Sequence, residues 1–523
     1  MGMSNGMEAL AGLLDGGRLV TDEAERDYFG QDYFNHGPMP EAVLQPASVD
    51  ELARVVKAAT AQGLAIYPRG GGWSYTDGYL VTKPGISIDM RAMCRVLEIN
   101  AEDMFVRVEA GCTWAELDAA LKPLGLRTPF WGPMSGRNAT VGGGASQGAI
   151  SFGSAKYGPS FDSIIGLVVV TADGRVVRTG SAAQGHHSAF FKGHGPEMTG
   201  MFCGDCGALG VKAEVVLRLM KRPKIAEGMS FGFASEADYF AAAAAVARTG
   251  LVTESIGTVA ETVSERAASL GVLDGVKALV QVVKTAPGLG TGLKRAAGMA
   301  LGGQRFADKF VMLLHVVVEG DTPAVIRAQA DAVRAAVEEA TADRGRETSN
   351  AVPTMLRADP FPAYDMLSFT GQRQLPPSTI LPFSKVMAFH KDLTARMAAR
   401  AEEMKRLGMI VLPVYATVGN YGFLYEIVMC WDDTIGEFHR RHTKAELVAK
   451  VEGRTDAPEA RALAAALRGD LIEVAHVHGG VHVQIGKVYP YLRDRDEVAT
   501  GLLRAWKREL DPAGLCNPGA LGL

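Results

Sequence analysis

Apolar and polar positions recur with two different periods along the chain, and each period predicts a type of element. In residues 48–63 the apolar side chains lie at helical spacing, which predicts a helix. Ser48 and Glu51 are typical of a capping box at its first turn. The runs LAIYP (64–68) and ISIDM (86–90) are short, apolar and bounded by turn formers, so we expect two strands with a loop between them.

The next region continues with strands, one helix and a long glycine-rich segment. Residues 105–126 predict a strand followed by a helix, whose start carries a second capping box of Thr113 and Glu116. Residues 129–158 contain eight glycines with little periodicity, and such a stretch in a compact domain is usually functional. Residues 164–181 predict a hairpin turned at Asp173-Gly174, and 207–223 predict one more strand.

In the middle of the chain, strands are followed by helices that can cover them. Residues 310–341 predict a buried strand, a turn and an amphipathic helix, and 408–433 predict two strands separated by Gly419-Asn420. A helix is expected over 436–453. This order indicates an antiparallel sheet with helices on one face, and hence an α+β fold.

Composition narrows the class of protein. A chain of 523 residues is too long for one core, and a net charge of -4 gives no nucleic-acid signal. The first residues lack the pattern of a secretory signal, and no apolar run reaches the roughly 18 residues of a membrane span, so we expect a cytoplasmic protein. Of the six cysteines only Cys203 and Cys206 have ligand spacing, and without a second pair we predict no metal site.

The glycine-rich loop PRGGGWSYTDGY (68–79) indicates a ligand that the backbone must approach closely. Successive backbone N–H groups of residues 69–74 can form a concave nest for a phosphate, with the charge of Arg69 nearby. A Rossmann or Walker loop runs from a strand directly into a helix, whereas this loop joins strand to strand. A glycine-rich hairpin without a ligand is the alternative.

The ordered series RGGGWS, VEAGCTWAEL, ATVGGG, KYG, GLVVVTADGRVVRTGS and GALGV resembles the flavin-binding domain of the vanillyl-alcohol oxidase / p-cresol methylhydroxylase (PCMH) superfamily. The closing LDPAGLCNPGALGL (510–523) also resembles the end of that family. The resemblance implies FAD, a two-part PCMH-type FAD-binding domain (1–224), a cap or substrate domain with an antiparallel sheet (225–475) and a C-terminal segment that returns to the flavin (476–523).

On this resemblance the glycine loop holds the two phosphates of FAD, and a second segment runs along the other side of the cofactor. The expected FAD contacts are Arg69, Gly70, Gly71, Gly72, Trp73, Ser74, Pro133, Met134, Ser135, Asn138, Ala139, Gly142, Gly143, Gly148, Gly210, Val211 and Asn517.

Flavin chemistry needs side chains that orient a C–H bond and accept the proton of the substrate oxygen. Tyr75 aligns with a tyrosine that binds the phenolate in phenol oxidases of this family, and Tyr489 lies in a segment where those relatives carry a tyrosine. Alternation of His476, His478 and His482 predicts a strand with the three histidines on one face. We therefore take Tyr75, His482 and Tyr489 as the catalytic candidates, with packed structural side chains as the alternative.

Two departures from the family limit what the resemblance implies. Met134 stands where the vanillyl-alcohol oxidases have an acidic residue near flavin N5, and Gly72-Trp73 replaces the histidine that attaches flavin in the berberine-bridge pattern. We therefore expect non-covalent FAD. Tyr425 falls near the position where other members attach the flavin, and it is the candidate if a covalent bond exists.

The sequence thus predicts an FAD-dependent oxidoreductase that removes hydride from a small alcohol, preferentially a phenolic or arylalkyl alcohol. The alternative substrate is a 2-hydroxy acid or sugar alcohol, which suits a histidine base. An NADPH-dependent flavin reductase and a non-enzymatic flavin-binding protein are further alternatives. Oxygen, a quinone or a cytochrome would reoxidise the flavin, a homodimer is possible, and the basic segment 276–310 is a candidate for membrane-surface or subunit contact or for a surface insertion.

Overall fold

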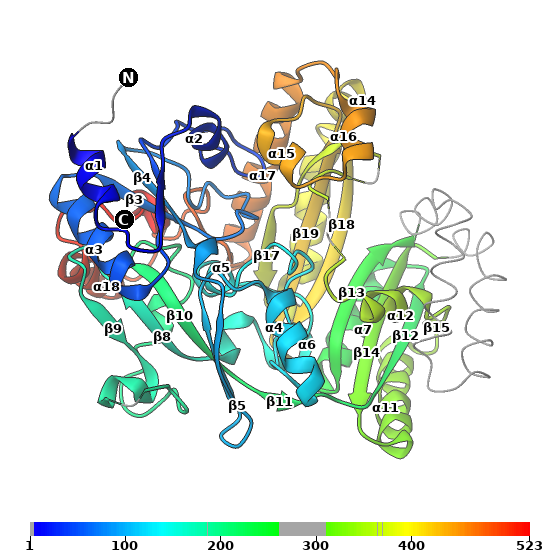
Figure 1. Cartoon of the computed structure of the whole chain (residues 1–523). Helices are drawn as coiled ribbons and strands as arrows, with labels where there is room; N and C mark the ends of the chain where they lie inside the picture. Colours follow the sequence, from blue (N-terminus) through cyan, green and yellow to red (C-terminus); the bar gives the residue numbers. More distant parts are fainter. Residues whose placement is uncertain (1–4, 186, 261–309, 363–364, 369) are drawn as a thin grey trace.

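The computed structural model describes residues 5–185, 187–260, 310–362, 365–368 and 370–523. Four sheets of the described residues and the helices around them form two regions that lie side by side in Figure 1, which confirms the α+β prediction. The first region holds the three smaller of these sheets. Most of segment 276–310 lies outside the described residues.

The first sheet carries the glycine loop at the end of one of its strands. In spatial order, its strands within the described chain are β1 (Arg18–Val20), β2 (Val43–Gln45), β4 (Gly85–Asp89) and β3 (Ala65–Arg69). β3 and β4 are parallel neighbours, and the predicted helix is α3 (Val49–Ala61). Ser48 caps α3, but the Glu51 carboxylate accepts from Gly16, Gly17 and Ala47 instead of closing the predicted box.

The second sheet backs the other glycine-rich segment. Its strands, in order, are β5 (Val96–Asn100), β6 (Phe105–Glu109), β10 (Val211–Arg218), β8 (Ile164–Val170) and β9 (Val176–Arg178). The predicted box of Thr113 and Glu116 is complete at the start of α4 (Trp114–Leu121). The glycines Gly142–Gly144 lie in the short helix α5 (Val141–Gln147), and a two-stranded ribbon of β7 (Leu126–Arg127) and β11 (Met220–Lys221) completes the region.

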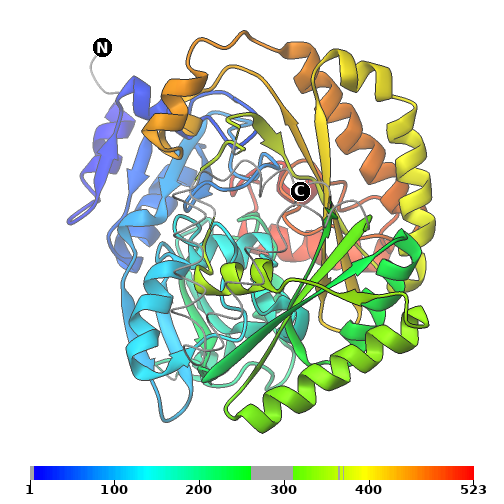
Figure 2. The ribbon, with the colours of Figure 1, turned by 90° about the vertical axis from the view of Figure 1, so that its right-hand side faces the viewer.

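The largest sheet, called the cap sheet below, forms the second region, and it is antiparallel as predicted. The first region is called the flavin region. Its strands among the described residues are β15 (Arg346–Glu347), β12 (Ile225–Phe233), β14 (Met312–Gly320), β13 (Val252–Val259), β18 (Ile410–Val418), β19 (Gly422–Trp431) and β16 (Arg373–Leu375), with β17 (Ser378–Leu381) also paired to β19. Four helices cover one face, as Figure 2 shows: α7 (Glu236–Arg248), α11 (Pro323–Thr341), α13 (Val386–Ala398) and α17 (Pro458–Val477).

The two faces of this sheet differ in burial. Tyr415, Phe423 and Tyr425 point into the buried core beneath the four helices. On the other face, which these four helices leave uncovered, Val414 and Glu426 are only half-buried. Side chains alternate between the faces along a strand, so this uncovered face is the surface that the sheet offers to the first region.

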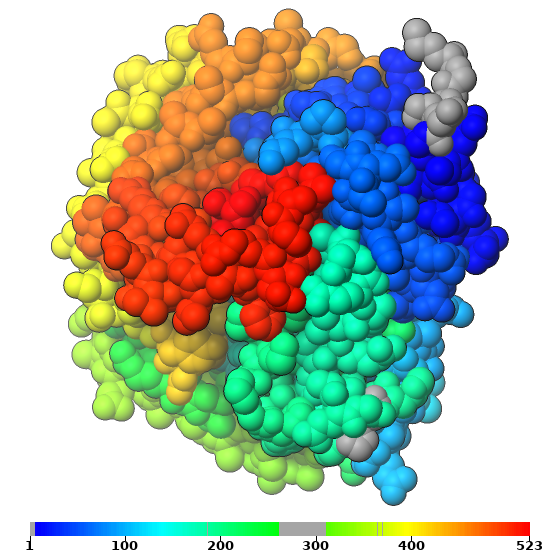
Figure 3. Space-filling model, turned by 90° about the vertical axis from the view of Figure 1, so that its left-hand side faces the viewer, coloured from blue at the N-terminus to red at the C-terminus, as the bar shows by residue number. Residues whose placement is uncertain are grey.

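The C-terminal residues return to the first sheet. Helix α18 (Glu497–Leu510) leads into a bridge between Cys516 and Ile66 of β3, and the Asn517 amide donates to the carbonyls of Gly78 and Cys206. Figure 3 shows this red segment lying against the blue N-terminal region. The closing segment therefore reaches the glycine loop, as the family resemblance implied.

The remaining helices are short connections. They are α1 (Asn5–Ala11), α2 (Glu23–Phe29), α6 (Ser154–Tyr157), α12 (Ala351–Ala358), α14 (Ala401–Arg406), α15 (Glu437–Arg441) and α16 (Ala445–Val451). The single helix predicted over 436–453 was wrong, since it is divided into α15 and α16. The predicted histidine strand was wrong as well, because His476 belongs to α17 and His478 is its C-terminal cap.

Candidate active site

The glycine loop leaves its backbone donors free. Within the described chain, none of the backbone N–H groups of Gly70–Ser74 donates a hydrogen bond to another protein atom. Gly72 has φ +79°, which turns the chain sharply here and is a conformation that glycine adopts without strain. Unpaired N–H groups that follow one another in this way form a binding site for an anion.

The second glycine segment lies directly against this loop. The Thr140 hydroxyl caps α5 by accepting from Gly143 N at 3.1 Å. A Cβ on Gly70 would collide with the Thr140 hydroxyl, and a Cβ on Gly71 would collide with the Asn138 carbonyl. These two glycines are therefore needed for the approach of the loops to each other, in addition to any ligand contact expected from the sequence.

The two segments line a cavity that is partly open to solvent. Thirteen of the seventeen residues expected at FAD line it: Arg69, Gly70, Gly71, Gly72, Trp73, Ser74, Pro133, Ser135, Ala139, Gly142, Gly143, Gly210 and Val211. The other four support it from behind: Met134 packs on the core, Asn138 contacts Gly71, Gly148 ends α5, and Asn517 binds carbonyls of the wall. Residues missed at the sequence level include Trp114, Gln147, Cys206 and Gln484.

Arg69 lines the cavity and also supports the loop from beneath. The phosphate contact expected from the sequence stays a prediction. Its guanidinium is buried over the rings of Tyr28, Phe29 and Tyr79 at 4.3, 4.6 and 4.7 Å, and it donates to the Tyr28 carbonyl at 2.9 Å. Cation–π contacts of this kind hold the side chain beneath the loop. The guanidinium thus supports the loop next to Gly72.

The cavity has the chemistry that a dinucleotide requires. Besides the free backbone donors, its walls include the buried indole nitrogens of Trp73 and Trp114, which have no partner in the described protein. Buried polar groups are normally satisfied, so these donors indicate a ligand with acceptor atoms. FAD fits this description, since it combines phosphates, hydroxyls and a polar ring edge.

Ser378 of β17 brings two of the predicted catalytic residues together. Its carbonyl accepts a hydrogen bond from His482 Nδ1 at 2.9 Å, and its N–H donates to the Tyr489 hydroxyl at 3.1 Å. The rings of His482 and Tyr489 are stacked, with centroids 4.1 Å apart and an interplanar angle of 9°. His482 Nε2 has no partner among the described residues, so its lone pair is available for a proton.

Tyr75 joins the same cluster from the glycine loop. Burial raises the pKa of its hydroxyl, and the proximity of Glu426 and Tyr489 raises it further. The ring of Tyr33 lies edge-on to that of Tyr75, with centroids 6.2 Å apart. Segments far apart in sequence therefore meet in one cluster.

Glu426 is a titratable residue of this cluster that the sequence analysis missed. It lies on the uncovered face of β19, in register with Ser378 of β17 and Val414 of β18. Burial raises the pKa of its carboxyl to about 8. The available signal was the alternation in FLYEIVMCW, because a lone carboxyl inside a strand of otherwise apolar residues is unusual.

Comparison with known proteins decides the family. The profile of the FAD binding domain matches residues 40–180, and the profile of the FAD linked oxidases, C-terminal domain, matches residues 222–521, more than half of the chain. The chain belongs to the FAD-linked oxidases. Its cofactor is FAD, and the resemblance to the PCMH-type proteins is confirmed.

Individual relatives resemble parts of this FAD-linked oxidase. Mitochondrial D-lactate dehydrogenase [cytochrome] of Arabidopsis thaliana is 34% identical over 39% of this chain and 35% of its own, and the glycolate oxidase subunit GlcD of Bacillus subtilis is 30% identical over 36% and 38%. The matched part thus spans little more than a third of these relatives. The structure of p-cresol methylhydroxylase with substrate bound covers 99% of this chain and 96% of its own, with a TM-score of 0.70 and 16% identity, which shows a common fold.

Tyr425, the candidate for covalent flavin attachment, is on the wrong face of the sheet. Its hydroxyl hydrogen-bonds with His390 Nδ1 at 2.8 Å within the core beneath the helices. Strand alternation places its neighbour Glu426 on the flavin side instead. The candidate is therefore rejected for this FAD-linked oxidase.

The other two histidines of the predicted row also have separate partners. His476 Nε2 pairs with Asp494 at 3.0 Å, and His478 Nε2 pairs with Asp392 at 2.7 Å. In the part of the chain that the structure describes, no group of three His, Cys, Asp or Glu side chains has the geometry of a metal site. The described helices include none that could cross a membrane.

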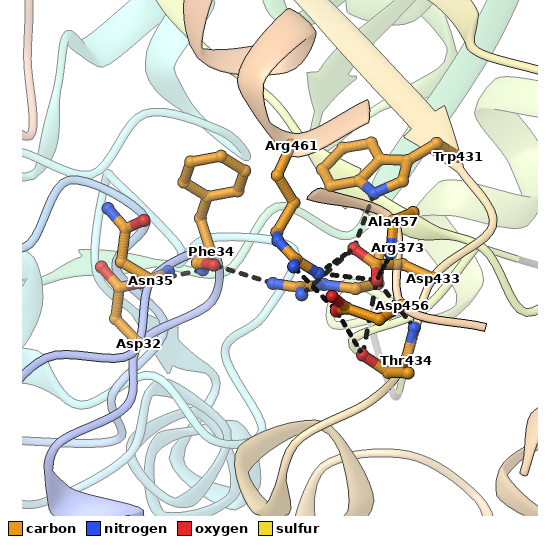
Figure 4. A network of polar contacts seen from close by, with 10 residues as sticks. All are labelled: Asp32, Phe34, Asn35, Arg373, Trp431, Asp433, Thr434, Asp456, Ala457 and Arg461. Carbon is orange, nitrogen blue, oxygen red and sulfur yellow. Dashed lines mark hydrogen bonds and ion pairs between the residues drawn. The ribbon is translucent and has the colours of Figure 1, made fainter. Parts of the chain in front are cut away.

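A buried ion network ties the cap sheet to the flavin region (Figure 4). Asp433, just after β19, accepts from Arg461 at 2.7 and 2.9 Å and lies 3.5 Å from Arg373. Arg373 donates to the Phe34 carbonyl at 2.7 Å, and the Phe34 N–H donates to Asp32. The network therefore fixes the turn that carries Tyr33.

Replacing Asp433 by alanine should destabilise the protein by about 3–5 kcal/mol, because two arginines lose a fully buried partner. Burial opposes ionisation of Asp433, but hydrogen bonds from Trp431 and Ala457 and the charges of Arg373 and Arg461 together hold its pKa below 3.8. Its contribution is thus present above pH 3.8 and is lost as pH falls through the lower folded value.

Urea unfolding of the holoprotein at neutral pH measures this loss. Asp456→Ala is the matched control, since Asp456 pairs with the same Arg461 from an exposed position. This replacement should lower the free energy of unfolding by less than about 1 kcal/mol. Equal stabilities of the two variants would mean that the buried ion pairs of Asp433 stabilise the protein no more than the exposed pair of Asp456 does.

Proposed function

We propose that this FAD-linked oxidase oxidises a 2-hydroxy acid to the 2-oxo acid. The observation that carries the proposal is the orientation of His482. Its Nδ1–H is engaged by the Ser378 carbonyl, which leaves Nε2 as the proton acceptor. Burial lowers the pKa of His482 despite the opposing hydrogen bond to Ser378, so the ring is neutral at pH 7 and able to act as a base.

The cofactor and the side chains have separate roles in this oxidation. FAD supplies the hydride acceptor when bound. His482 takes the proton of the substrate hydroxyl as the hydride leaves the carbon that bears this hydroxyl. Tyr75 and Tyr489 are expected to orient the substrate oxygens, because phenolic hydroxyls both donate and accept hydrogen bonds.

The names of the relatives favour a 2-hydroxy acid, because D-lactate and glycolate, after which two relatives are named, both belong to this class. Glycolate is achiral, so it is the D-lactate name that favours an acid of the D series. Their similarity to this chain is partial, so the substrate is a proposal about the site of this chain. The phenolic preference drawn from the sequence becomes the second candidate.

A phenolic or arylalkyl alcohol is favoured by one specific observation. Tyr33, Tyr75 and Tyr489 all contribute aromatic hydroxyls to one cluster, and such groups hydrogen-bond a phenol oxygen well. However, the Tyr489 hydroxyl already accepts from Ser378, and burial raises the pKa of Tyr489 to about 12. The site therefore offers a phenolate little charge stabilisation.

Anaerobic mixing of the holoprotein with candidate substrates tests the proposal. We expect D-2-hydroxy acids to bleach the flavin, and L-2-hydroxy acids, sugar alcohols and para-alkylphenols to reduce it far more slowly. Fast bleaching by a para-alkylphenol alone would favour the second candidate. Rapid reduction by NADPH would indicate a reductase, and a flavin that no compound reduces would indicate a binding protein.

The same experiment, continued with an electron acceptor, identifies the partner that reoxidises the flavin. Oxygen, a quinone or a cytochrome c is added to the reduced enzyme, and the rate of flavin reoxidation is measured. An oxidase reacts rapidly with oxygen, whereas a dehydrogenase needs one of the other acceptors. A homodimer and a cytoplasmic location stay predictions.

A further inference from the structure

Gln484 connects the cofactor cavity to the cluster of Tyr75, His482 and Tyr489. Among the described residues it is the only one beyond Lys212 that lines the cavity, whose other walls belong to the flavin region. Gln484 follows the proposed base His482 by two residues, so their Cα atoms lie at most about 7 Å apart. The chain itself therefore places this part of the cavity wall close to the base.

The backbone of Gln484 has a conformation that glycine normally occupies. Its φ is +55°, in the left-handed region that is costly for a residue with a Cβ. Backbone hydrogen bonds fix this segment on the flavin region: Gln484 N–H donates to the Gln147 carbonyl at 2.7 Å, Gly486 N–H to Cys206 Sγ at 3.2 Å, and Lys487 N–H to the Thr76 carbonyl at 2.8 Å. A strained residue held in this way by its surroundings is typical of a functional site.

The path of the chain does not explain why this residue is a glutamine. Glycine would adopt the same conformation without strain. The protein does not stabilise the side chain either, because the half-buried carboxamide of Gln484 makes no hydrogen bond with any residue that the structure describes. A carboxamide has two N–H donors and an acceptor oxygen. Unused polar atoms at the wall of the FAD cavity indicate a contact with the cofactor.

The position of the base indicates which part of FAD this side chain meets. His482 accepts the proton of the substrate hydroxyl while hydride moves to the flavin, so the flavin ring belongs at this end of the cavity. The phosphates belong at the free backbone donors of Gly70–Ser74. The polar edge of the ring carries mainly acceptor atoms and gains negative charge on reduction, so an amide N–H is the matching group.

We propose that the Gln484 carboxamide donates a hydrogen bond to the polar edge of the flavin ring and thereby raises the reduction potential of the bound FAD. The inference rests on the proposed function only for the role of His482, which places the ring. A donor aimed at developing negative charge favours hydride transfer, because it binds the reduced form more strongly than the oxidised form.

Gln484→Gly removes the side chain without straining the backbone, so the variant should fold and retain FAD. Loss of the donor should weaken binding of the reduced flavin by about 10- to 100-fold relative to the oxidised flavin. For a two-electron couple this lowers the reduction potential by about 30 to 60 mV. Equilibrium reduction of the holoprotein against a reference dye, without substrate, measures the potential.

Gln484→Glu tests whether the amide donor matters rather than the size of the side chain. An ionised carboxylate of nearly the same shape only accepts hydrogen bonds, and its charge would face that of the reduced ring. The potential should therefore fall further than in Gln484→Gly.

Asp343→Gly is the matched control for the backbone. Asp343 has φ +62°, is exposed and lies outside the cavity. This replacement should relieve similar strain and leave both the reduction potential and the absorption spectrum of the flavin unchanged.

Two results would overturn the inference. The first is a reduction potential in either Gln484 variant that is as high as that of the parent. The second is weaker FAD binding by Gln484→Gly with an unchanged potential of the flavin that stays bound, which would place the side chain at the phosphate or adenine end. None of these measurements needs a substrate. If 2-hydroxy acids fail to reduce the flavin, the proposed function fails, while the potentials still decide the role of Gln484.

Discussion

Replacing His482 by alanine should slow anaerobic reduction of the bound flavin by the substrate by about 100- to 10,000-fold, the range for loss of a positioned general base. The ring is fixed twice, by the hydrogen bond from Nδ1 to the Ser378 carbonyl and by stacking on Tyr489. Without it, water has to take the hydroxyl proton. Stopped-flow absorbance of the flavin, at saturating substrate, measures the effect directly.

His478→Ala is the matched control for this variant. His478 caps the end of α17 and pairs with Asp392, so it should leave the reduction rate and the flavin content unchanged. The His482 variant must also retain its flavin. Reduction at the parent rate by an intact His482→Ala holoprotein would remove this residue from the proton transfer.

The second large effect is expected from Gly143→Val, which should weaken FAD binding by about 10- to 100-fold, because adding methyl groups to a filled site costs about 1–3 kcal/mol. Gly143 lines the cavity, and a Cβ there meets only the Thr140 hydroxyl, at 3.1 Å. The added side chain thus occupies space of the cofactor. Flavin content after purification and FAD titration of the apoprotein measure the loss.

Gly71→Val would be a poorer test of the same site. Its side chain would strike the Asn138 carbonyl, so loss of flavin could follow from displaced loops. Gly193→Val is a suitable control, since a Cβ at Gly193 meets nothing within 4 Å and the residue is outside the cavity. A folded Gly143→Val protein with the flavin content of the parent would contradict our placement of FAD.

Local sequence determined much of the flavin region. The apolar period of residues 48–63 and the complete box at Thr113 and Glu116 fix helix starts through contacts within one turn. The hairpin at Asp173-Gly174 and the two strands around Gly419-Asn420 are likewise local decisions. The glycine loop was recognisable because closely spaced glycines, which have no side chains, let a ligand approach the free backbone N–H groups.

The sequence was a weaker guide where its local pattern allows both a strand and a helix at a similar free energy. His476 and His478 alternate as in a strand, yet burial of the apolar face of α17 against the cap sheet extends the helix through His476, and His478 becomes its cap. Burial of one apolar helical face stabilises the protein more than the local preference of two alternating residues for a strand. The histidine row was therefore lost, and only His482 reached the cluster.

Only the tertiary structure decided which face of each cap strand meets the flavin region. In FLYEIVMCW the alternation separates Tyr425 from Glu426, but it does not say which of the two faces the four helices cover. Packing of those helices buried Tyr425 beneath them and left Glu426 on the opposite face. The meeting of Tyr75, Ser378, Glu426 and His482 likewise depends on contacts across hundreds of residues, which no local pattern encodes.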